Sequence, residues 1–173
     1  MIAADHRPIT YLEGDAVVYR ASAIGGCPVA LIASRLGEMP GGTPARVLDA
    51  AEMGVQLEPI ALQALEMAGW RVQGQQEEVE REHLISGLEQ RVVVRGHLDA
   101  VGDPVDGGPT AVVEVKSRNH EDWARIVRDG WAAVPEAHLW QMSAYDDAVG
   151  LERIAYVAIS RATREVHTLL AAR

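Results

Sequence analysis

The sequence is poor in several residue types, and each shortage narrows what the protein can be. Its 173 residues include one cysteine, Cys27, which excludes an intramolecular disulfide and a zinc or iron–sulfur site built from several cysteines. No apolar run approaches the ~18 residues of a membrane span, and the N-terminus lacks a signal-peptide pattern, so we expect a cytoplasmic protein without a membrane partner. The net charge of −9 argues against non-specific nucleic-acid binding through overall charge.

Lysine is equally scarce: Lys116 is the only one among 16 basic residues, and the rest are arginine. Scarce lysine, absent phenylalanine and abundant alanine suggest a GC-rich genome, which explains the rarity of lysine but not its position. Lys116 lies two residues after Glu114 in an apolar, β-branched segment typical of a strand, so both side chains project from one face. The pair is either a surface salt bridge of little value or part of a site that uses the adjustable pKa of lysine.

The hydrophobic pattern predicts one domain over residues 1–173, with a helical part at about 20–68 and a sheet-containing part at about 69–173. Asp103–Pro109 is dense in turn residues, so we expect the strands on either side of it to pair as an antiparallel hairpin. The expected elements, in chain order, are helices at 22–37 and about 45–68 (broken or bent near Gly54 and Pro59), strands at 70–79, 91–101 and 110–116, a helical or irregular segment at 120–131, a helix at 135–149, and strands at 153–159 and 165–170.

Acidic residues are predicted to gather around Lys116. Asp99 lies on the polar face of the strand before the hairpin turn, and Glu114 and Lys116 lie on the polar face of the strand after it. Neighbouring strands lie ~4.8 Å apart and alternate residues ~6.6 Å apart, so the three side chains can converge on one small patch. Carboxylates supply the hard oxygen ligands that suit Mg²⁺ or Mn²⁺. A lysine beside them can hold or deprotonate a metal-bound water molecule and stabilise a phosphate oxygen.

Two helices carry further candidates. Glu58 lies in an apolar helix beside Leu57, where a carboxylate needs a partner such as a metal unless it lies at the helix edge and is solvated. Gln141 and Tyr145 are four residues apart on the helix at 135–149 and share a face. They either hydrogen-bond the substrate or the site, or they form an ordinary helix–sheet contact.

Taken in order, these residues resemble the motifs of the PD-(D/E)XK nuclease superfamily, and in particular its RecB-like and phage-type exonuclease branch. The motifs are Gly54-x-x-x-Glu58, Gly96-His-Leu-Asp99, Glu114-Val-Lys116 and Gln141-x-x-x-Tyr145. The resemblance covers about residues 20–160. It implies an α/β (α+β) fold with a restriction-endonuclease-like αβββαβ core, whose mixed central sheet is flanked by helices. CRISPR-associated members of this branch hold an iron–sulfur cluster with four cysteines, and none is expected here because Cys27 stands alone.

The resemblance implies a metal-dependent nuclease that hydrolyses DNA phosphodiester bonds, an exonuclease of phage-type DNA processing, recombination or repair in a bacterial or phage-infected cytoplasm. It implies that one or two Mg²⁺ or Mn²⁺ ions bind Glu58, Asp99, Glu114 and the backbone carbonyl of Val115. Lys116, Glu114 and Asp99 would be catalytic. The residues that would contact the substrate or support the ligands are Gln141, Tyr145, His97 and Arg118. The expected partner is linear double- or single-stranded DNA; a recombination or helicase partner and a second copy of the chain are left open.

Several alternatives stay open. His97 is equally well a strand residue without chemistry, and each single arginine offered for phosphate contacts (Arg91, Arg95, Arg118, Arg125 and Arg128) is more often an ordinary solvated charge. The chain could be a non-catalytic DNA-binding or assembly module on a nuclease fold, although its complete acid–acid–lysine set argues against this. It could also bind a sugar or nucleotide and use Glu114 and Lys116 as a structural ion pair, but it lacks a glycine-rich phosphate loop.

Overall fold

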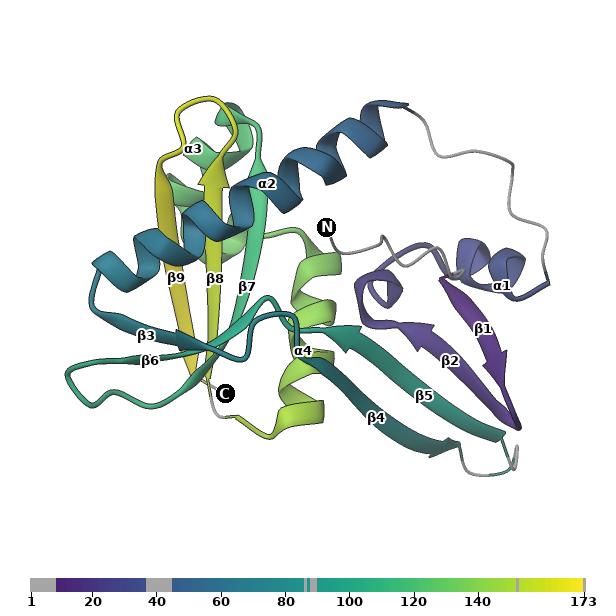
Figure 1. The fold of residues 1–173 in the computed structure, drawn as a ribbon. Helices are drawn as coiled ribbons and strands as arrows, with labels where there is room; N and C mark the ends of the chain where they lie inside the picture. Colours follow the sequence, from purple (N-terminus) through teal and green to yellow (C-terminus); the bar gives the residue numbers. More distant parts are fainter. Residues whose placement is uncertain (1–8, 37–44, 86, 88–89, 152, 173) are drawn as a thin grey trace.

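The computed structural model describes residues 9–36, 45–85, 87, 90–151 and 153–172, and its strands form two sheets (Figure 1). The first sheet has four strands in the order β1-β2-β5-β4, and the second has five in the order β3-β6-β7-β8-β9. The strands are β1 Thr10–Glu13, β2 Ala16–Arg20, β3 Trp70–Gln73, β4 Glu78–Ile85, β5 Gln90–His97, β6 Ala100–Pro104, β7 Ala111–Arg118, β8 Arg153–Ser160 and β9 Val166–Ala172. The helices are α1 Pro28–Leu36, α2 Ala45–Met67, α3 His120–Asp129 and α4 Glu136–Val149, with the short 3₁₀ helices η1 Ala21–Ala23 and η2 Gly130–Ala133.

The five-stranded sheet holds most of the core. β7 and β8 run parallel, while the other neighbouring strands are antiparallel. Helix α2 crosses one face of this sheet, and α3 and α4 pack on the other (Figure 1). Leu57 of α2 packs with Val113 and Val115, and Met142 of α4 packs with Tyr156. Because helices cover both faces, β7 from Ala111 to Val115 and β8 from Ala155 to Ser160 are buried on both sides.

This mixed sheet flanked by helices confirms the expected fold class, but the four-stranded sheet was not expected. Its strands β1 and β2 are only four and five residues long, which leaves little periodicity to detect. Helix α4 contacts both sheets and stands between them (Figure 1). The single strand predicted at 70–79 is wrong, because β3 and β4 belong to different sheets and the turn Gly74–Glu77 separates them.

The strand predicted at 91–101 is also divided. β5 ends at His97, β6 begins at Ala100, and Asp99 lies in the bend between them. Only β6 pairs with β7, through Ala100 opposite Val113, so the predicted hairpin is correct for β6 alone. The apolar alternation runs through the bend without interruption. The period of two therefore could not reveal that the chain crosses there from one sheet to the other.

The helices differ from prediction in their details. α2 runs unbroken through Gly54 and Pro59, because buried residues on both sides of the proline pack on the sheet and outweigh one missing helical hydrogen bond. α1 begins at Pro28, which suits a first helical turn, and not at Ser22; Gly37, its expected end, lies outside the described residues. The expected α3, α4 and β8–β9 hairpin are confirmed. In the part of the chain that the structure describes, no helix is both long and apolar enough to cross a membrane.

Candidate active site

The candidate site lies along the edge of β7 that β6 leaves open. β6 pairs with β7 only from Ala111 to Val113, so beyond Val113 this edge has no neighbouring strand within the described residues. Asp99 replaces the missing strand, and its Oδ2 accepts a hydrogen bond from the Val115 backbone N–H at 2.7 Å. Because the N–H and C=O of one strand residue point to the same side, the Val115 carbonyl faces this edge as well.

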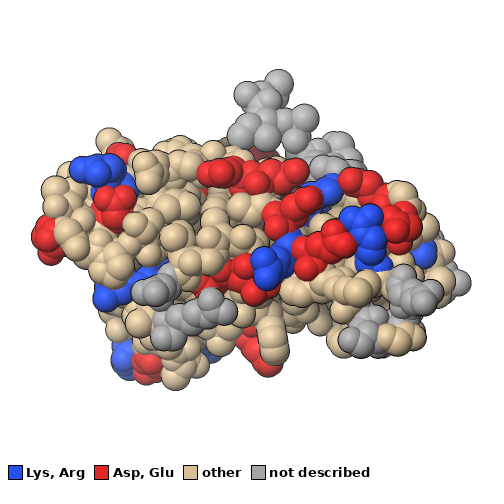
Figure 2. All heavy atoms as spheres, turned by 90° about the horizontal axis from the view of Figure 1, so that it is seen from below, with Lys and Arg blue, Asp and Glu red and all other residues tan. Residues whose placement is uncertain are grey.

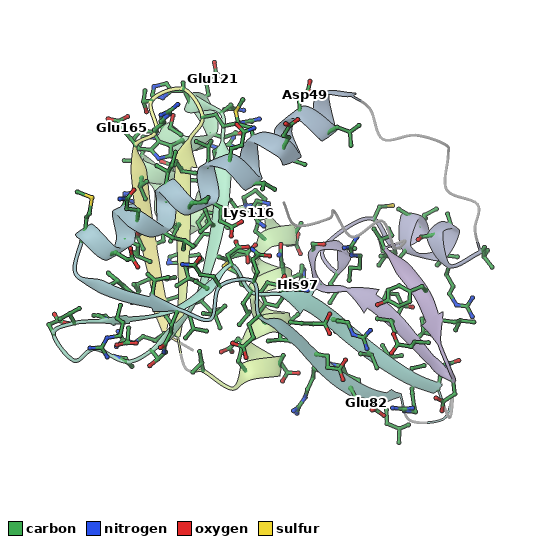
Figure 3. All side chains as sticks on the ribbon, viewed as in Figure 1. Asp49, Glu82, His97, Lys116, Glu121 and Glu165 are labelled. Carbon is green, nitrogen blue, oxygen red and sulfur yellow. The ribbon has the colours of Figure 1, made fainter. Side chains whose placement is uncertain are left out.

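Glu114 and Lys116 project from the opposite face of β7 to Val113 and Val115. Glu114 is fully buried, its Oε1 contacts the Lys116 ammonium, and its Oε2 has no hydrogen-bond partner among the described residues. A buried carboxylate oxygen without a partner is costly, so it calls for a ligand. Lys116 lies near the centre of the molecule, between α2 and α4 (Figure 3).

Three carboxyl groups around Lys116 resist ionisation. Burial raises the pKa of Glu114 to about 8, with a further rise from Asp99 and opposition from Lys116. Burial likewise raises the pKa of Asp99, and burial followed by the charge of Asp99 raises the pKa of Glu58. Burial lowers the pKa of Lys116, but Glu114 and Asp99 outweigh it and leave the pKa above its ordinary value. The single ammonium is therefore charged and does not satisfy the three acids around it.

Glu58 reaches the site from α2 and meets a residue that the sequence did not single out. Gln76 Nε2 donates to Glu58 Oε1 at 2.8 Å, and the nearby Gln76 side chain also lowers the pKa of Asp99. Gln76 lies in the turn between β3 and β4. The misassigned strand at 70–79 concealed it, and the turn residue Gly74 was the one local signal.

Gln141 and Tyr145 face the site together from α4. Gln141 Nε2 donates to Tyr145 Oη at 3.1 Å, and both side chains are buried. Burial raises the pKa of the Tyr145 phenol, and the Glu114 charge raises it further, which places this hydroxyl near the acids. A Cβ at Gly96 would lie 2.7 Å from Tyr145 Cε1 and 2.8 Å from Ala21 Cβ, so glycine is required where β5 packs against the tyrosine.

His138 is a second residue that the sequence did not reveal. Its Nδ1 lies 3.0 Å from Tyr156 Oη, and the two rings stack with their centroids 5.9 Å apart. Burial lowers the pKa of His138 to about 3, with further lowering by Lys116 and Arg118, so the ring is neutral. Its spacing of three from Gln141 places it on the same face of α4, which is the signal that could have found it.

Of two expected contributors to the site, His97 lies away from the acids and Arg118 lies beside Lys116. His97 is exposed at the end of β5, and its Nε2 lies 3.6 Å from Glu78 Oε2. Arg118 projects from the same face of β7 as Lys116, is 17% exposed, and lies 3.6 Å from Asp122. The geometry thus brings Arg118 next to the lysine and leaves His97 at the surface.

The arginines of β5 do not have free guanidinium groups. Arg91 bonds both oxygens of Glu82 at 2.8 Å, and Arg95 bonds Glu13 at 2.7 Å and Glu80 at 2.8 Å. Seen from below, acidic and basic side chains are interspersed over this part of the surface (Figure 2). Phosphate contacts by Arg91 and Arg95 are therefore not supported, because carboxylates already occupy both groups.

The donor chemistry of the site fits a hard divalent cation. Three carboxylates and the Val115 carbonyl offer oxygen ligands only, and Glu114 Oε2 lacks a partner among the described residues. In the described part of the chain, however, no three acidic, histidine or cysteine side chains are already close enough to hold an ion. The ligand atoms are of the type that binds such a cation, and binding requires the side chains to move closer together around it.

Comparison with known proteins defines the fold. No protein-family model and no curated protein matches the chain. The solved structure of SSO0001 is 15% identical, with a TM-score of 0.60 over 94% of this chain and 69% of that one. The alkaline exonuclease LHK-Exo from Laribacter hongkongensis is 17% identical, with a TM-score of 0.59 over 89% of this chain and 76% of that one, and its complex with dAMP gives 0.57. At these identities the likeness shows the fold, which is that of restriction-endonuclease-like nucleases.

Proposed function

We propose that this chain is a divalent-cation-dependent nuclease that hydrolyses DNA phosphodiester bonds. The observation that carries the proposal is the meeting of Glu58, Asp99, Glu114 and the only lysine at the open edge of β7. Support comes from the shared fold, since LHK-Exo is an alkaline exonuclease that has been crystallised with dAMP. We further propose a single-domain exonuclease of the RecB-like branch, acting on linear DNA in cytoplasmic phage-type processing, recombination or repair.

The proposed roles follow from the chemistry of each group. Glu58, Asp99, Glu114 and the Val115 carbonyl would hold Mg²⁺ or Mn²⁺. When bound, the cation supplies Lewis-acid polarisation of a phosphoryl oxygen and lowers the pKa of its water. Lys116, kept protonated by the acids beside it, donates hydrogen bonds to the attacking water or to a phosphate oxygen.

Helix α4 completes the proposed site. The Tyr145 phenol keeps its proton because its pKa is raised, so it can orient a water or a phosphate oxygen while Gln141 fixes its hydroxyl. Arg118 extends the positive charge of Lys116 along the same face of β7 and is proposed to contact the phosphate backbone. Without the cation nothing would polarise the phosphoryl oxygen or lower the pKa of the attacking water, so we expect no cleavage in its absence.

Cleavage assays on linear and circular DNA test the proposal. We expect the wild type to degrade linear DNA with Mg²⁺ or Mn²⁺ and to stop in EDTA. Lys116→Ala should lower the rate by about 10²- to 10³-fold, the usual cost of removing a positioned hydrogen-bond donor from an active site. Lys116→Arg should also be impaired, because a planar guanidinium does not replace a compact ammonium. Arg71→Ala, which changes an exposed arginine on β3, is the matched control and should cleave normally.

The outcomes separate the competing functions. If Lys116→Ala cleaves as well as the wild type, the role given to the lysine is wrong. If the wild type binds DNA but cleaves no DNA or RNA with either cation, the chain is a binding module on a nuclease fold. Degradation of circular DNA would show an endonuclease in place of an exonuclease.

A further inference from the structure

The turn between β3 and β4 holds a glutamine in an unusual backbone conformation. Gln76 has φ +56° and occupies the third position of the turn Gly74–Glu77, where glycine or asparagine is usual. For a residue with a Cβ this left-handed conformation is strained, because the Cβ comes too close to the following carbonyl oxygen. Such conformations persist where the surroundings fix them, and they concentrate at functional sites. The turn therefore needs a reason to keep glutamine where glycine would be unstrained.

Hydrogen bonds tie this turn to the candidate site. Glu77 N–H donates to the Gly74 carbonyl at 3.3 Å, and Leu98 N–H donates to the Glu77 carbonyl at 2.9 Å. Leu98 immediately precedes Asp99, so the turn and the bend that carries Asp99 are held as one unit. The backbone thereby places the Gln76 side chain between Asp99 and α2.

The Gln76 amide lies between two acids from different elements. Its Nε2 donates to Glu58 Oε1 at 2.8 Å, and the nearby Gln76 side chain also lowers the pKa of Asp99. Close carboxylates repel each other, and an amide that binds one and lies beside the other holds them near each other without adding charge. A lysine or arginine in its place would neutralise the acids and compete with a cation.

We infer that Gln76 is a positioning residue that sets the spacing of Glu58 and Asp99 for a divalent cation. This inference rests on the proposed function, because it assumes that the two acids bind metal. It adds a part of the site, supplied by the β3–β4 turn, that lies outside the four motifs read in the sequence. The strained backbone and the position between the two acids are explained together by this single role.

Gln76→Gly tests the inference, because glycine removes the amide and also relieves the positive φ. Mn²⁺ affinity is measured by calorimetry on the full chain without DNA, and thermal unfolding is measured in EDTA. We expect Mn²⁺ to bind about 10- to 100-fold more weakly, as when a hydrogen-bond partner of a metal ligand is lost. The unfolding temperature in EDTA should not fall. Gln75→Gly, at the exposed neighbouring position of the same turn, is the matched control and should bind Mn²⁺ like the wild type.

A second readout distinguishes positioning from general damage. For Gln76→Gly we expect the Mg²⁺ concentration at half-maximal cleavage to rise, while the rate at saturating Mg²⁺ recovers toward the wild-type value. If Gln76→Gly binds Mn²⁺ as tightly as the wild type, the role of Gln76 is wrong while the metal site stands. If the wild type binds no Mn²⁺ at all, the metal site and the role of Gln76 are both wrong.

Discussion

Two clusters of charged side chains, one at each sheet, have the same formal charge, but the pKa values of Glu82 in one and Glu114 in the other shift in opposite directions. The surface cluster on the four-stranded sheet has four carboxylates (Glu13, Asp15, Glu80, Glu82) and two guanidiniums (Arg91, Arg95), a net charge of −2. The β7 cluster has three carboxylates (Glu58, Asp99, Glu114) and one ammonium (Lys116), also −2. Hydrogen bonding to Arg91 lowers the pKa of Glu82, whereas burial raises the pKa of Glu114 to about 8.

Burial, and not the count of charges, separates the two clusters. In the surface cluster, solvent screens the excess negative charge and each guanidinium bonds carboxylates directly. In the β7 cluster, Glu114 is fully buried and bulk solvent does not screen it, so the excess charge remains a cost. A bound divalent cation would remove that cost in the buried cluster and would offer little to the surface cluster. The following tests exploit this contrast, beginning with the largest expected effect.

Neutralising one acid in each cluster should affect cleavage very differently. Glu114→Gln removes a proposed metal ligand and should therefore lower the cleavage rate strongly. The loss should exceed the roughly 10- to 100-fold that follows when only a hydrogen-bond partner of a ligand is removed. Glu82→Gln should leave the rate unchanged, since its carboxylate only pairs with Arg91. Initial rates on linear DNA at saturating Mg²⁺ measure both. Equal rates for the two variants would contradict the functional distinction between the clusters.

The pH dependence of stability should separate the same two variants in EDTA. Glu114 has a folded pKa of about 8, above the ordinary 4.5, so its contribution is fully present below pH 4.5 and is lost as pH rises to 8. Glu114→Gln should therefore gain stability over the wild type between pH 5 and 8, by on the order of a few kcal/mol at pH 8. Thermal or urea unfolding across this range measures the difference.

Glu82→Gln is the control for this measurement. The pKa of Glu82 is lowered, so its contribution is present above pH 4.5 and is lost only as pH falls through the folded pKa. Its difference from the wild type should stay constant between pH 5 and 8. A Glu114→Gln curve parallel to that of the wild type would show that Glu114 ionises normally.

The arginines beside the two clusters should differ in their contribution to DNA affinity, and this difference should be smaller than the effects above. Arg118→Gln should weaken binding and reduce the slope of log K against log salt by about 0.7 to 0.9, the value of one lost phosphate contact. Arg91→Gln should change neither quantity, because Glu82 and Asp15 already occupy its guanidinium. Titrations with Ca²⁺ in place of Mg²⁺, at several salt concentrations, measure both. A larger loss for Arg91→Gln would place the DNA on the four-stranded sheet.

Features that depend on local periodicity could be predicted from the sequence. The alternation in β7 placed Glu114 and Lys116 on one face, and the spacing in α4 placed Gln141 and Tyr145 on one face, where they hydrogen-bond. The fold class was predicted from the resemblance of the ordered motifs to a known superfamily. The roles assigned to these residues in metal binding and catalysis stay predictions, because geometry alone does not test them.

The way in which separate segments meet became visible in the three-dimensional structure. It divided the strand at 91–101 at Asp99, so that Asp99 could take the Val115 N–H at the open edge of β7. It brought Gln76 from a turn to Glu58 on α2, and it placed carboxylates around Arg91 and Arg95. The physical reason is that local side-chain periodicity records which face a residue occupies. The contacts made there depend on packing between elements distant in sequence, and no short pattern carries that information.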